Sequence, residues 1–309
     1  MKKIGLFLIC AALLGGCMKP KVELPDFNKM WDYNNPTETE IKFRALVEDA
    51  KANDIEYYGE LLTQIARIQG LQRKFEEADK TLEMAKEYAI DKYPTVKIRY
   101  ILEKGRVLNS SGKGVESIPI FKEAYDFGMK HKLDFYTLDA AHMLGIVNIP
   151  EVQLEWNLKA LKIAETSEDK RVKGWLGPLY NNIGWTYHDL EKYEEALDLF
   201  LKGYDWRVSV KDENGARIGK WTIGRAQRSL KRYDEALKTQ MEVQDDFVKA
   251  GLEPDGYLYE EMAELHLIKG QADIARKYFE LAWEKLSQDQ WMMDNETERM
   301  NRLKKMADK

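Results

Sequence analysis

The chain has 309 residues, a third of them charged, and its formal net charge at pH 7 is −5. This negative balance argues against a nucleic-acid partner, because phosphate neutralisation requires an excess of lysine and arginine on one surface. Only two cysteines are present, Cys10 and Cys17, so the sequence has no cysteine-rich framework of the kind that stabilises small secreted domains.

The first residues have the layout of a secretory signal. Met1-Lys2-Lys3 is followed by an apolar run from Ile4 to Leu14, which is too short to span a bilayer as a permanent helix. The next four residues, Leu14-Gly15-Gly16-Cys17, resemble the lipobox of bacterial lipoproteins, in which the cysteine is acylated and begins the mature chain. We therefore predict a signal peptide over residues 1–16 and a lipid on Cys17. The alternative is an ordinary cleaved signal with Cys17 as a bystander.

Removal of this signal would have two consequences. Cys10 would be lost, so the mature chain could not form an internal disulfide and packing alone would have to stabilise it. The loss of Lys2 and Lys3 would lower the formal net charge from −5 to −7. Met18 stands where an aspartate retains enterobacterial lipoproteins in the inner membrane. We therefore expect the bacterial cell envelope as the location, and the outer membrane if the cell has one.

Residues 17–36 are predicted to be a flexible tether, because prolines and the pair Asn34-Asn35 interrupt any helical period. A helix should begin after Pro36, where Thr37-Glu38-Thr39-Glu40 has the capping-box pattern. The apolar positions of this helix are Phe43, Leu46, Val47 and Ala50. They predict an N-terminal capping helix for the fold that follows.

The clearest internal motif lies between Tyr180 and Gly203. It reads Tyr180-x2-Ile183-Gly184-x2-Tyr187, then Tyr193-x2-Ala196-x3-Phe200-x2-Gly203, which is the tetratricopeptide-repeat (TPR) pattern of two antiparallel helices, A and B. The small residues Gly184 and Ala196 let the two helices approach closely. The bulky side chains of Tyr180 and Phe200 then fill the space between neighbouring repeats.

Alignment on the small helix-B residue Ala196 finds five further repeats. Their small helix-B positions are Ala78, Ser117, Gln153, Ala236 and Ala275, and their helix-A partners are Ala66, Gly105, Ala141, Gly224 and Ala263. The third repeat fits least well, because Gln153 is not small. We predict an all-α, right-handed TPR helical solenoid of about six repeats over residues 37–309, as one continuous domain.

The sequence also makes predictions about the turns and the C-terminal end of this solenoid. The repeats are spaced 36 to 43 residues apart, which exceeds the usual 34 of TPR sequences. The extra residues must lie in longer helices or in longer turns. Residues 169–177 and 211–215 are the candidates for longer turns. A charged helix over residues 295–307, with Met300, Leu303 and Met306 on one side, should cap the C-terminal end. Trp291, Met292 and Met293 are expected to pack it in place.

The alignment also predicts a ligand-binding groove, because certain helix-A positions of TPR arrays usually face the concave side. Arginine forks there could bind carboxylates, and indoles could stack on apolar or sugar groups. The alternative is that the arginines pair with acidic residues of neighbouring helices and the indoles fill gaps between repeats. The predicted groove residues are Arg67, Arg106, Asn109, His142, Asn181, Trp185, His188, Trp221, Arg225 and Arg228, with Arg99, Glu260 and Glu264 also at groove-facing positions.

Catalytic and metal signatures are weak. The four histidines lie in different repeats without a His-x3-His pair, so the sequence predicts no metal site and no cofactor. It has neither a P-loop nor a Gly-x-Ser-x-Gly elbow, which makes an enzyme the less favoured interpretation. A hydrolase would require a pocket that joins His142 or His188 to a nucleophile or a metal.

Segments such as Asn181-Asn-Ile-Gly-Trp-Thr-Tyr-His and Glu253-Pro-Asp-Gly-Tyr resemble a family of bacterial TPR proteins that has no agreed biochemical role. The resemblance implies the fold over residues 30–305 without supplying sites. The Lys-then-Asn clamp of chaperone-binding TPR domains is missing from the matching positions. Our leading hypothesis is a lipid-anchored adaptor that binds a protein or peptide in its groove. The alternative is an envelope lipoprotein that binds a glycan or another small ligand through Trp185 and Trp221.

Overall fold

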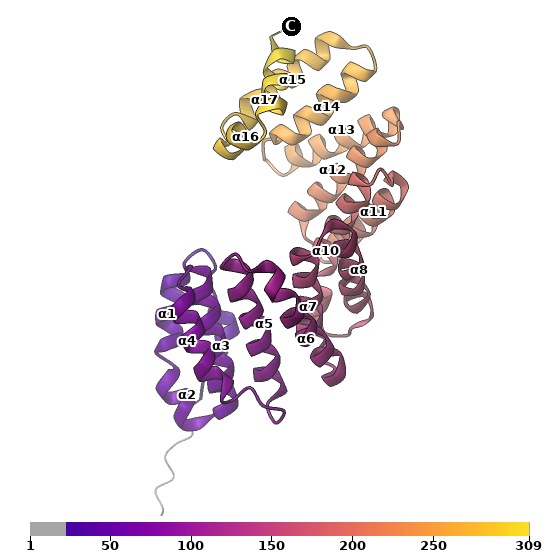
Figure 1. The fold of residues 1–309 in the computed structure, drawn as a ribbon. Coiled ribbons are helices and arrows are strands. Elements are labelled where there is room, and N and C mark those ends of the chain that lie inside the picture. Colours follow the sequence, from indigo (N-terminus) through magenta and orange to yellow (C-terminus); the bar gives the residue numbers. More distant parts are fainter. Residues whose placement is uncertain (1–22, 309) are drawn as a thin grey trace, which may run out of the picture. The chain divides into compact units, whose positions relative to one another are not determined.

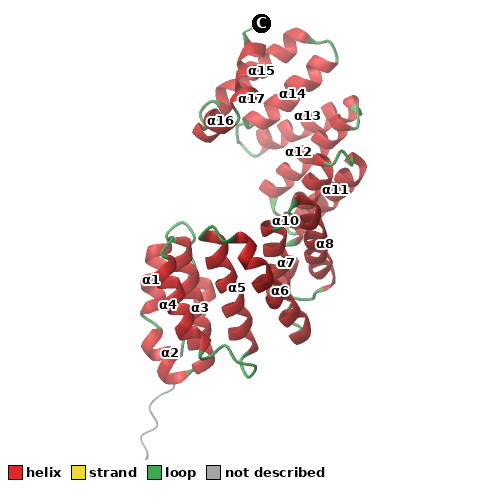
Figure 2. Cartoon of the chain, viewed as in Figure 1, coloured by secondary structure: helices red, strands yellow, loops and turns green. Residues whose placement is uncertain are grey.

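The structure is a computed structural model that describes residues 23–308, and these residues form helices and no strand (Figures 1 and 2). The chain divides into two compact units, Met1–Ser111 and Gly112–Lys309. Unit 1 contains η1 (Phe27–Met30), α1 (Pro36–Arg44), α2 (Val47–Asn53), α3 (Ile55–Leu71), α4 (Phe75–Lys86) and α5 (Pro94–Ser110).

Unit 2 is a stack of antiparallel helix pairs that follow one another in sequence order. Its helices are α6 (Gly114–His131), α7 (Asp134–Val147), α8 (Pro150–Thr166), α9 (Lys170–Lys173), α10 (Leu176–Asp189), α11 (Tyr193–Ser209), α12 (Glu213–Ser229), α13 (Tyr233–Lys249), α14 (Gly256–Ile268), α15 (Ala272–Leu286), α16 (Gln290–Asn295) and α17 (Thr297–Ala307). Each pair also contacts the next: α11 packs on α12, and α13 packs on α14. This stacking is the repeat architecture that the sequence predicts.

Five of the six predicted repeats correspond to a packed helix pair: α3 with α4, α7 with α8, α10 with α11, α12 with α13, and α14 with α15. The predicted all-α class is therefore confirmed. The division between the units falls inside the second predicted repeat, so α5 is described with unit 1 and α6 with unit 2.

Close approach of helices A and B requires the small residues that define the repeat. A Cβ atom added to Gly184 on α10 would lie 2.4 Å from Cε1 of Phe200 on α11. In the next repeat, a Cβ on Gly224 would lie 2.4 Å from Nε2 of Gln240. In the third repeat, Gln153 is only half-buried, and buried Asn157 packs against Gly145 instead. The poor match at Gln153 thus reflects a local change in packing, and the pair of α7 and α8 is intact.

Five of the turns from helix A to helix B are three residues long and use a left-handed residue one place before the N-cap. These residues are Arg73, Gly112, Glu191, Lys231 and Gly270, with φ between 58° and 88°. A left-handed residue ends a helix and reverses the chain in a very short connection. The turns are therefore short, and the excess length of the repeats lies mainly in helices of up to 18 residues.

This arrangement corrects the predicted long turn at residues 211–215. Only residues 210–212 separate α11 from α12, and Asp212 accepts a hydrogen bond from the backbone N–H of Gly215 as the N-cap of α12. The other candidate, residues 169–177, does hold extra length, because the short helix α9 lies between α8 and α10.

The predicted tether is shorter than residues 17–36. Residues 17–22 lie outside the described residues, but Phe27 is only 3% exposed and packs edge-on against Phe43. The first helix also starts earlier than the capping-box pattern predicts, because Asn35 caps the backbone N–H of Glu38. A break after α1 then divides the predicted capping helix into α1 and α2. The segment before α1 therefore belongs to the folded core of unit 1.

At the C-terminal end, α17 forms as predicted, with Met300 and Leu303 buried. Met292 on α16 is buried in the same cluster, and Met293 packs against it. Trp291 was expected to help hold this cap, but its side chain is 59% exposed. The prediction was wrong for Trp291 because the turn of α16 that buries Met292 directs its neighbour toward solvent.

Candidate binding surface

In unit 1, two of the predicted groove arginines bind a buried carboxylate. Glu103 on α5 is 3% exposed, and its Oε1 lies 3.2 Å from Nη1 of Arg67 on α3 and 2.6 Å from Nη1 of Arg106 one turn along α5. The guanidinium of Arg67 also lies over the ring of Trp31. Asn109 is half-buried on the same helix, α5. The arginines of this unit thus have internal partners.

Arg99, also on α5, joins the N-terminal segment to the repeats. Its Nε lies 3.1 Å from Oε2 of Glu60, and its Nη2 donates a hydrogen bond of 2.9 Å to Oδ1 of Asn28. The side chain is buried against the ring of Phe27. This arginine therefore stabilises the fold and is shielded from an external ligand.

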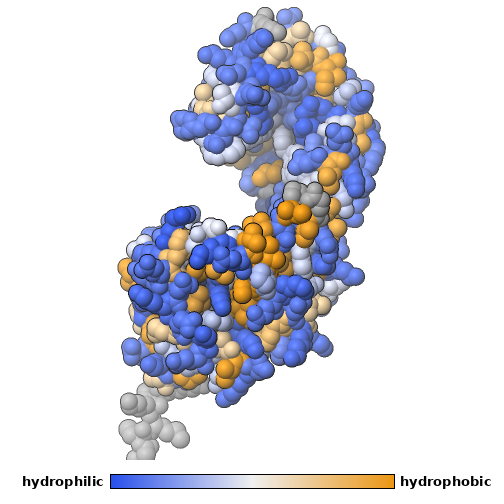
Figure 3. Space-filling view, viewed as in Figure 1, coloured by the Kyte–Doolittle hydropathy of each residue, from blue (hydrophilic) through white to orange (hydrophobic). Residues whose placement is uncertain are grey.

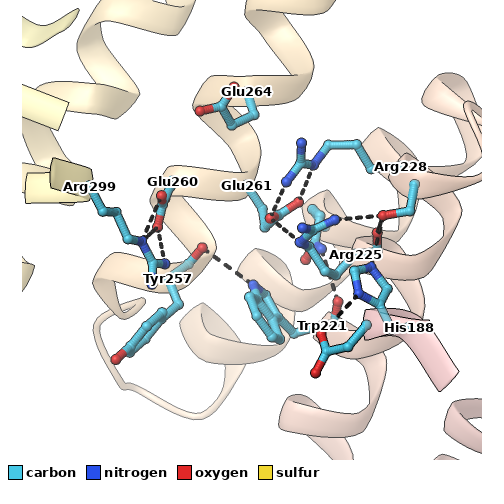
Figure 4. Close-up of polar contacts among 12 residues, drawn as sticks. His188, Trp221, Arg225, Arg228, Tyr257, Glu260, Glu261, Glu264 and Arg299 are labelled. Carbon is cyan, nitrogen blue, oxygen red and sulfur yellow. Dashed lines mark hydrogen bonds and ion pairs between the residues drawn. The ribbon is translucent and has the colours of Figure 1, made fainter. Parts of the chain in front are cut away.

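In unit 2, three aromatic residues from successive helices A form a continuous row. Trp185 on α10 lies 6.0 Å from Trp221 on α12, and Trp221 lies 6.3 Å from Tyr257 on α14, measured between ring centroids. The indole N–H of Trp221 donates a 3.3 Å hydrogen bond to the backbone carbonyl of Tyr257 (Figure 4). All three rings are partly exposed, with Tyr257 at 38%. We call Trp185, Trp221 and Tyr257 the aromatic row.

Beside the aromatic row, Glu261 on α14 holds the predicted arginines of α12. Its carboxylate is 4% exposed and accepts hydrogen bonds of 2.7 and 2.8 Å from Nε and Nη2 of Arg228, and Nε of Arg225 lies 3.1 Å away (Figure 4). Burial opposes the charge of Arg228, but the hydrogen bonds to Glu261 outweigh it and raise the pKa. Burial lowers the pKa of Arg225, which nevertheless stays charged because arginine titrates far above neutral pH.

Next to this pair, His188 on α10 makes a polar contact with Ser229 on α12. The Nε2 atom lies 2.9 Å from Oγ of Ser229, which also accepts a 2.7 Å hydrogen bond from Nη1 of Arg225. Burial, and then the charge of Arg225, lower the pKa of His188. Oδ1 of Asp189 lies 4.0 Å from Nδ1, beyond hydrogen-bond distance, so no carboxylate orients the ring as a catalytic triad would require. The pair is best explained as part of the contact between two repeats.

The remaining predicted residues, on α7, α10 and α14, have contacts of their own. His142 on α7 packs edge-on against the ring of Trp175 at 5.1 Å. Asn181 on α10 donates a hydrogen bond of 3.3 Å to its neighbour Asn182. On α14, next to Glu261, Glu260 is bound by Arg299 of α17 and Glu264 by Arg302 of the same helix. Most charged residues predicted for the groove thus pair with neighbouring helices, as the alternative interpretation of the sequence anticipated.

The structure adds three residues that the predicted set lacks. Tyr257 and Ser229 occupy the second and thirteenth helix-A positions of their repeats, which usually face the groove, so the alignment contained the signal for both. Glu261 is at the sixth position, which lies outside that rule. Only the packing of α14 on α12 shows that its carboxylate holds two arginines.

Comparison with known proteins agrees with this fold. Residues 177–207, from α10 and α11, match the family model for the tetratricopeptide repeat. Among solved structures, the apo form of RapI superposes with a TM-score of 0.67 at 15% identity, covering 85% of this chain and 76% of that one. The C-terminal part of a TPR repeat-containing protein from Cytophaga hutchinsonii gives 0.56 at 16% identity, covering 87% and 97%. The chain thus contains a tetratricopeptide repeat and has the fold of TPR solenoids.

A third structural relative is a signal transduction ATPase with numerous domains that has a TPR sensor, from Pyrococcus horikoshii. Its TM-score is 0.64 at 16% identity, and the match covers 87% of this TPR chain but 44% of the ATPase. At such identities the likeness shows the fold alone. No curated protein sequence matches the chain significantly.

The aromatic row of this TPR protein bears on the glycan alternative. Stacking of a sugar on both indoles would require exposed, coplanar rings. Instead the planes of Trp185 and Trp221 are inclined by 42°, and Trp185 also packs against Phe200. Each indole is part of a core cluster between repeats. The two indoles therefore do not form the coplanar, exposed pair that sugar stacking on both rings would require.

Two further observations concern the part of the TPR chain between residues 23 and 308. No group of three or more His, Cys, Asp or Glu side chains there is arranged to hold a metal ion. No helix in that part combines the length and apolar character that a membrane span requires. On the face of the molecule drawn in Figure 3, hydrophilic side chains predominate and hydrophobic ones form smaller patches.

Proposed function

We propose that this TPR protein is a lipid-anchored adaptor that binds a protein or peptide partner through the helix-A face of unit 2. The observation that carries the proposal is the aromatic row, in which three successive repeats each present a partly exposed ring. Aromatic side chains with large contact areas and few rotatable bonds are enriched at the energetic centres of protein interfaces.

The arginines have a different role in this proposal from the one first predicted. Arg225 and Arg228 are already bound to Glu261, so their capture of a partner carboxylate would first require the loss of that ion pair. We infer that they hold α12 against α14 and keep Trp221 beside Tyr257. The partner would then contact the rings, and the arginines would fix the spacing of the rings.

Site-specific photocrosslinking tests the binding surface. A photoreactive amino acid in place of Tyr257 should give a discrete adduct in native membranes. Trp185→Ala, on the neighbouring part of the row, should reduce its yield. The matched control position is Met241, which is 52% exposed on helix B of the fifth repeat, α13. Equal adducts from both positions, or none from Tyr257, would exclude the helix-A face as the partner surface.

The lipid anchor is a separate part of the proposal and has its own test. It rests on the lipobox-like Leu14-Gly15-Gly16-Cys17, which lies outside the described residues. Metabolic labelling with a fatty acid should mark the wild-type protein and the Cys10→Ala variant, but not Cys17→Ser. A label that persists in Cys17→Ser, or its absence from the wild type, would contradict acylation at Cys17 and leave the adaptor proposal to the crosslinking experiment.

A further inference from the structure

A cleft of about 470 Å³ opens between α12, α13 and α14 of unit 2. Its walls are largely apolar, with Trp221 and Ile218 from α12, Phe247 from α13 and Tyr257 from α14. Two charged side chains, Arg217 and Asp255, also line it. This volume lies within the usual range for small-molecule sites, which combine apolar walls with a few polar groups.

Arg217 differs from the other arginines of unit 2. Each of the others has a carboxylate oxygen within 4.0 Å, as Arg228 has in Glu261 and Arg207 has in Asp212. Within the described residues, Arg217 has no such ion pair. Its guanidinium lies over the ring of Phe247, its Nε is buried without a hydrogen-bond partner, and its Nη2 makes only a long hydrogen bond of 3.4 Å to Asn214. A half-buried cation without a counter-charge is costly and calls for an explanation.

Of the carboxylates that line the cleft and the adjoining hollow, Glu213, one turn before Arg217 on α12, is exposed, and none makes an ion pair with Arg217. Asp246, which lines the adjoining hollow, accepts a hydrogen bond of 2.6 Å from Nζ of Lys220. Asp255 caps α14 by accepting a 2.9 Å hydrogen bond from the backbone N–H of Leu258. Asp212 is bound by Arg207. A ligand carboxylate would therefore have no ion pair of Arg217 to displace within the described residues.

We propose that this cleft binds a small organic acid, in which a single carboxylate is attached to an aromatic or aliphatic body. The carboxylate would pair with the guanidinium of Arg217, whose donors match its two oxygens. The body would lie between Phe247, Trp221 and Tyr257, where its burial is favourable. Trp221 and Tyr257 also belong to the aromatic row, but ligand binding here does not depend on a protein partner.

The second charged residue of the cleft limits the charge of the ligand. Asp255 is an acid on the wall of the same cleft, and only one arginine faces the ligand. A dianion such as a phosphate monoester would be repelled by Asp255 more strongly than a monoanion, because like charges at close range oppose binding. The cleft therefore selects a carboxylate over a phosphate ester of the same body.

Nuclear magnetic resonance titration of the purified mature chain tests this site with 4-phenylbutanoate as the probe. The indole N–H resonance of Trp221 should shift as the acid binds. The neutral 4-phenylbutanamide should bind about tenfold more weakly, because it lacks the charge-assisted hydrogen bonds to Arg217. 2-Phenylethyl phosphate should also bind more weakly than the acid.

Two variants separate the site from general effects. Arg217→Gln should weaken binding of 4-phenylbutanoate about tenfold and leave binding of the amide unchanged. Arg276→Gln, at an arginine of α15 outside the cleft, should behave as the wild type, and circular dichroism will establish that both variants are folded. The proposal is overturned if acid and amide bind equally, if Arg217→Gln binds the acid as tightly as wild type, or if millimolar acid leaves the Trp221 resonance unmoved. It is also overturned if only a Gly-Ser-Glu-Phe-Ser-Gly peptide binds, which would assign the cleft to the protein partner.

Discussion

Both units bury a glutamate beneath two arginines, but the two clusters join different parts of the fold. In unit 1, Arg67 and Arg106 share one oxygen of Glu103, and Arg67 also covers Trp31 of the segment before α1. This cluster therefore ties the N-terminal segment to the first repeats. In this unit, Arg67 on helix A of the first repeat thus helps to hold the N-terminal segment in place.

In unit 2, the corresponding cluster joins consecutive repeats. Arg225 and Arg228, one turn apart on α12, use both oxygens of Glu261 on α14. The aromatic row next to it stays partly exposed, and Arg217 stays without a carboxylate. In both units, the arginines that share a glutamate thus form structural contacts. The groups available to a ligand are the aromatic row and Arg217, which take no part in these ion pairs.

The largest expected effect comes from removal of a clustered glutamate. Glu261→Ala would leave two half-buried guanidinium groups without their buried counter-charge and should lower the free energy of unfolding by about 3 kcal/mol. Glu103→Ala should have a similar effect in unit 1. Urea denaturation, with hydrogen exchange followed by mass spectrometry, would measure the loss and localise each change to its own unit.

Glu264→Ala is the matched control for this comparison. Its partner Arg302 is about half exposed, so loss of this pair should cost less than about 1 kcal/mol. If Glu261→Ala were no more destabilising than Glu264→Ala, the buried clusters would not be the contacts that hold the repeats together.

A smaller effect is expected from the glycines that bring helices A and B together. In Gly184→Ala the new Cβ would overlap the ring of Phe200 in unit 2 and should destabilise the protein by about 1–3 kcal/mol. In unit 1, the nearest atom to a Cβ on Gly70 is Cγ2 of Val107 at an ordinary 3.7 Å. Gly70→Ala should therefore be neutral or slightly stabilising in thermal unfolding. Equal losses in both variants would contradict the packing argument.

The smallest expected effect is a pH dependence confined to unit 2, because all four histidines follow residue 111. Burial lowers the pKa of His188 in the folded state, so below its ordinary pKa of 6.5 the unfolded chain binds more protons than the folded one. The stability of unit 2 should therefore fall as the pH drops below 6.5. His188→Gln should reduce this dependence in urea titrations at pH 5.5 and 7.5, and an unchanged pH profile would exclude His188 as its source.

Much of the fold was readable from the sequence because the repeat is a local pattern. The spacing of Gly184, Ala196 and Phe200 places small and bulky residues on facing sides of two helices, and this geometry requires no distant information. The predicted tether was too long, because the packing of its second half depends on contacts with segments distant in the sequence. Phe27 belongs to the core of unit 1 although its surroundings in the sequence resemble a linker.

The candidate site was less predictable for a physical reason. Helix-A periodicity selects the positions that face one side, and it found Trp185 and Trp221 in this way. Periodicity cannot show whether a charged side chain on that side already has a partner, as Arg228 has and Arg217 has not. The sequence by itself determined an all-α chain of TPR helix pairs, because small and large residues recur at fixed spacing. Only the tertiary structure decided which charges are neutralised, because ion pairing depends on the distance between side chains of successive repeats.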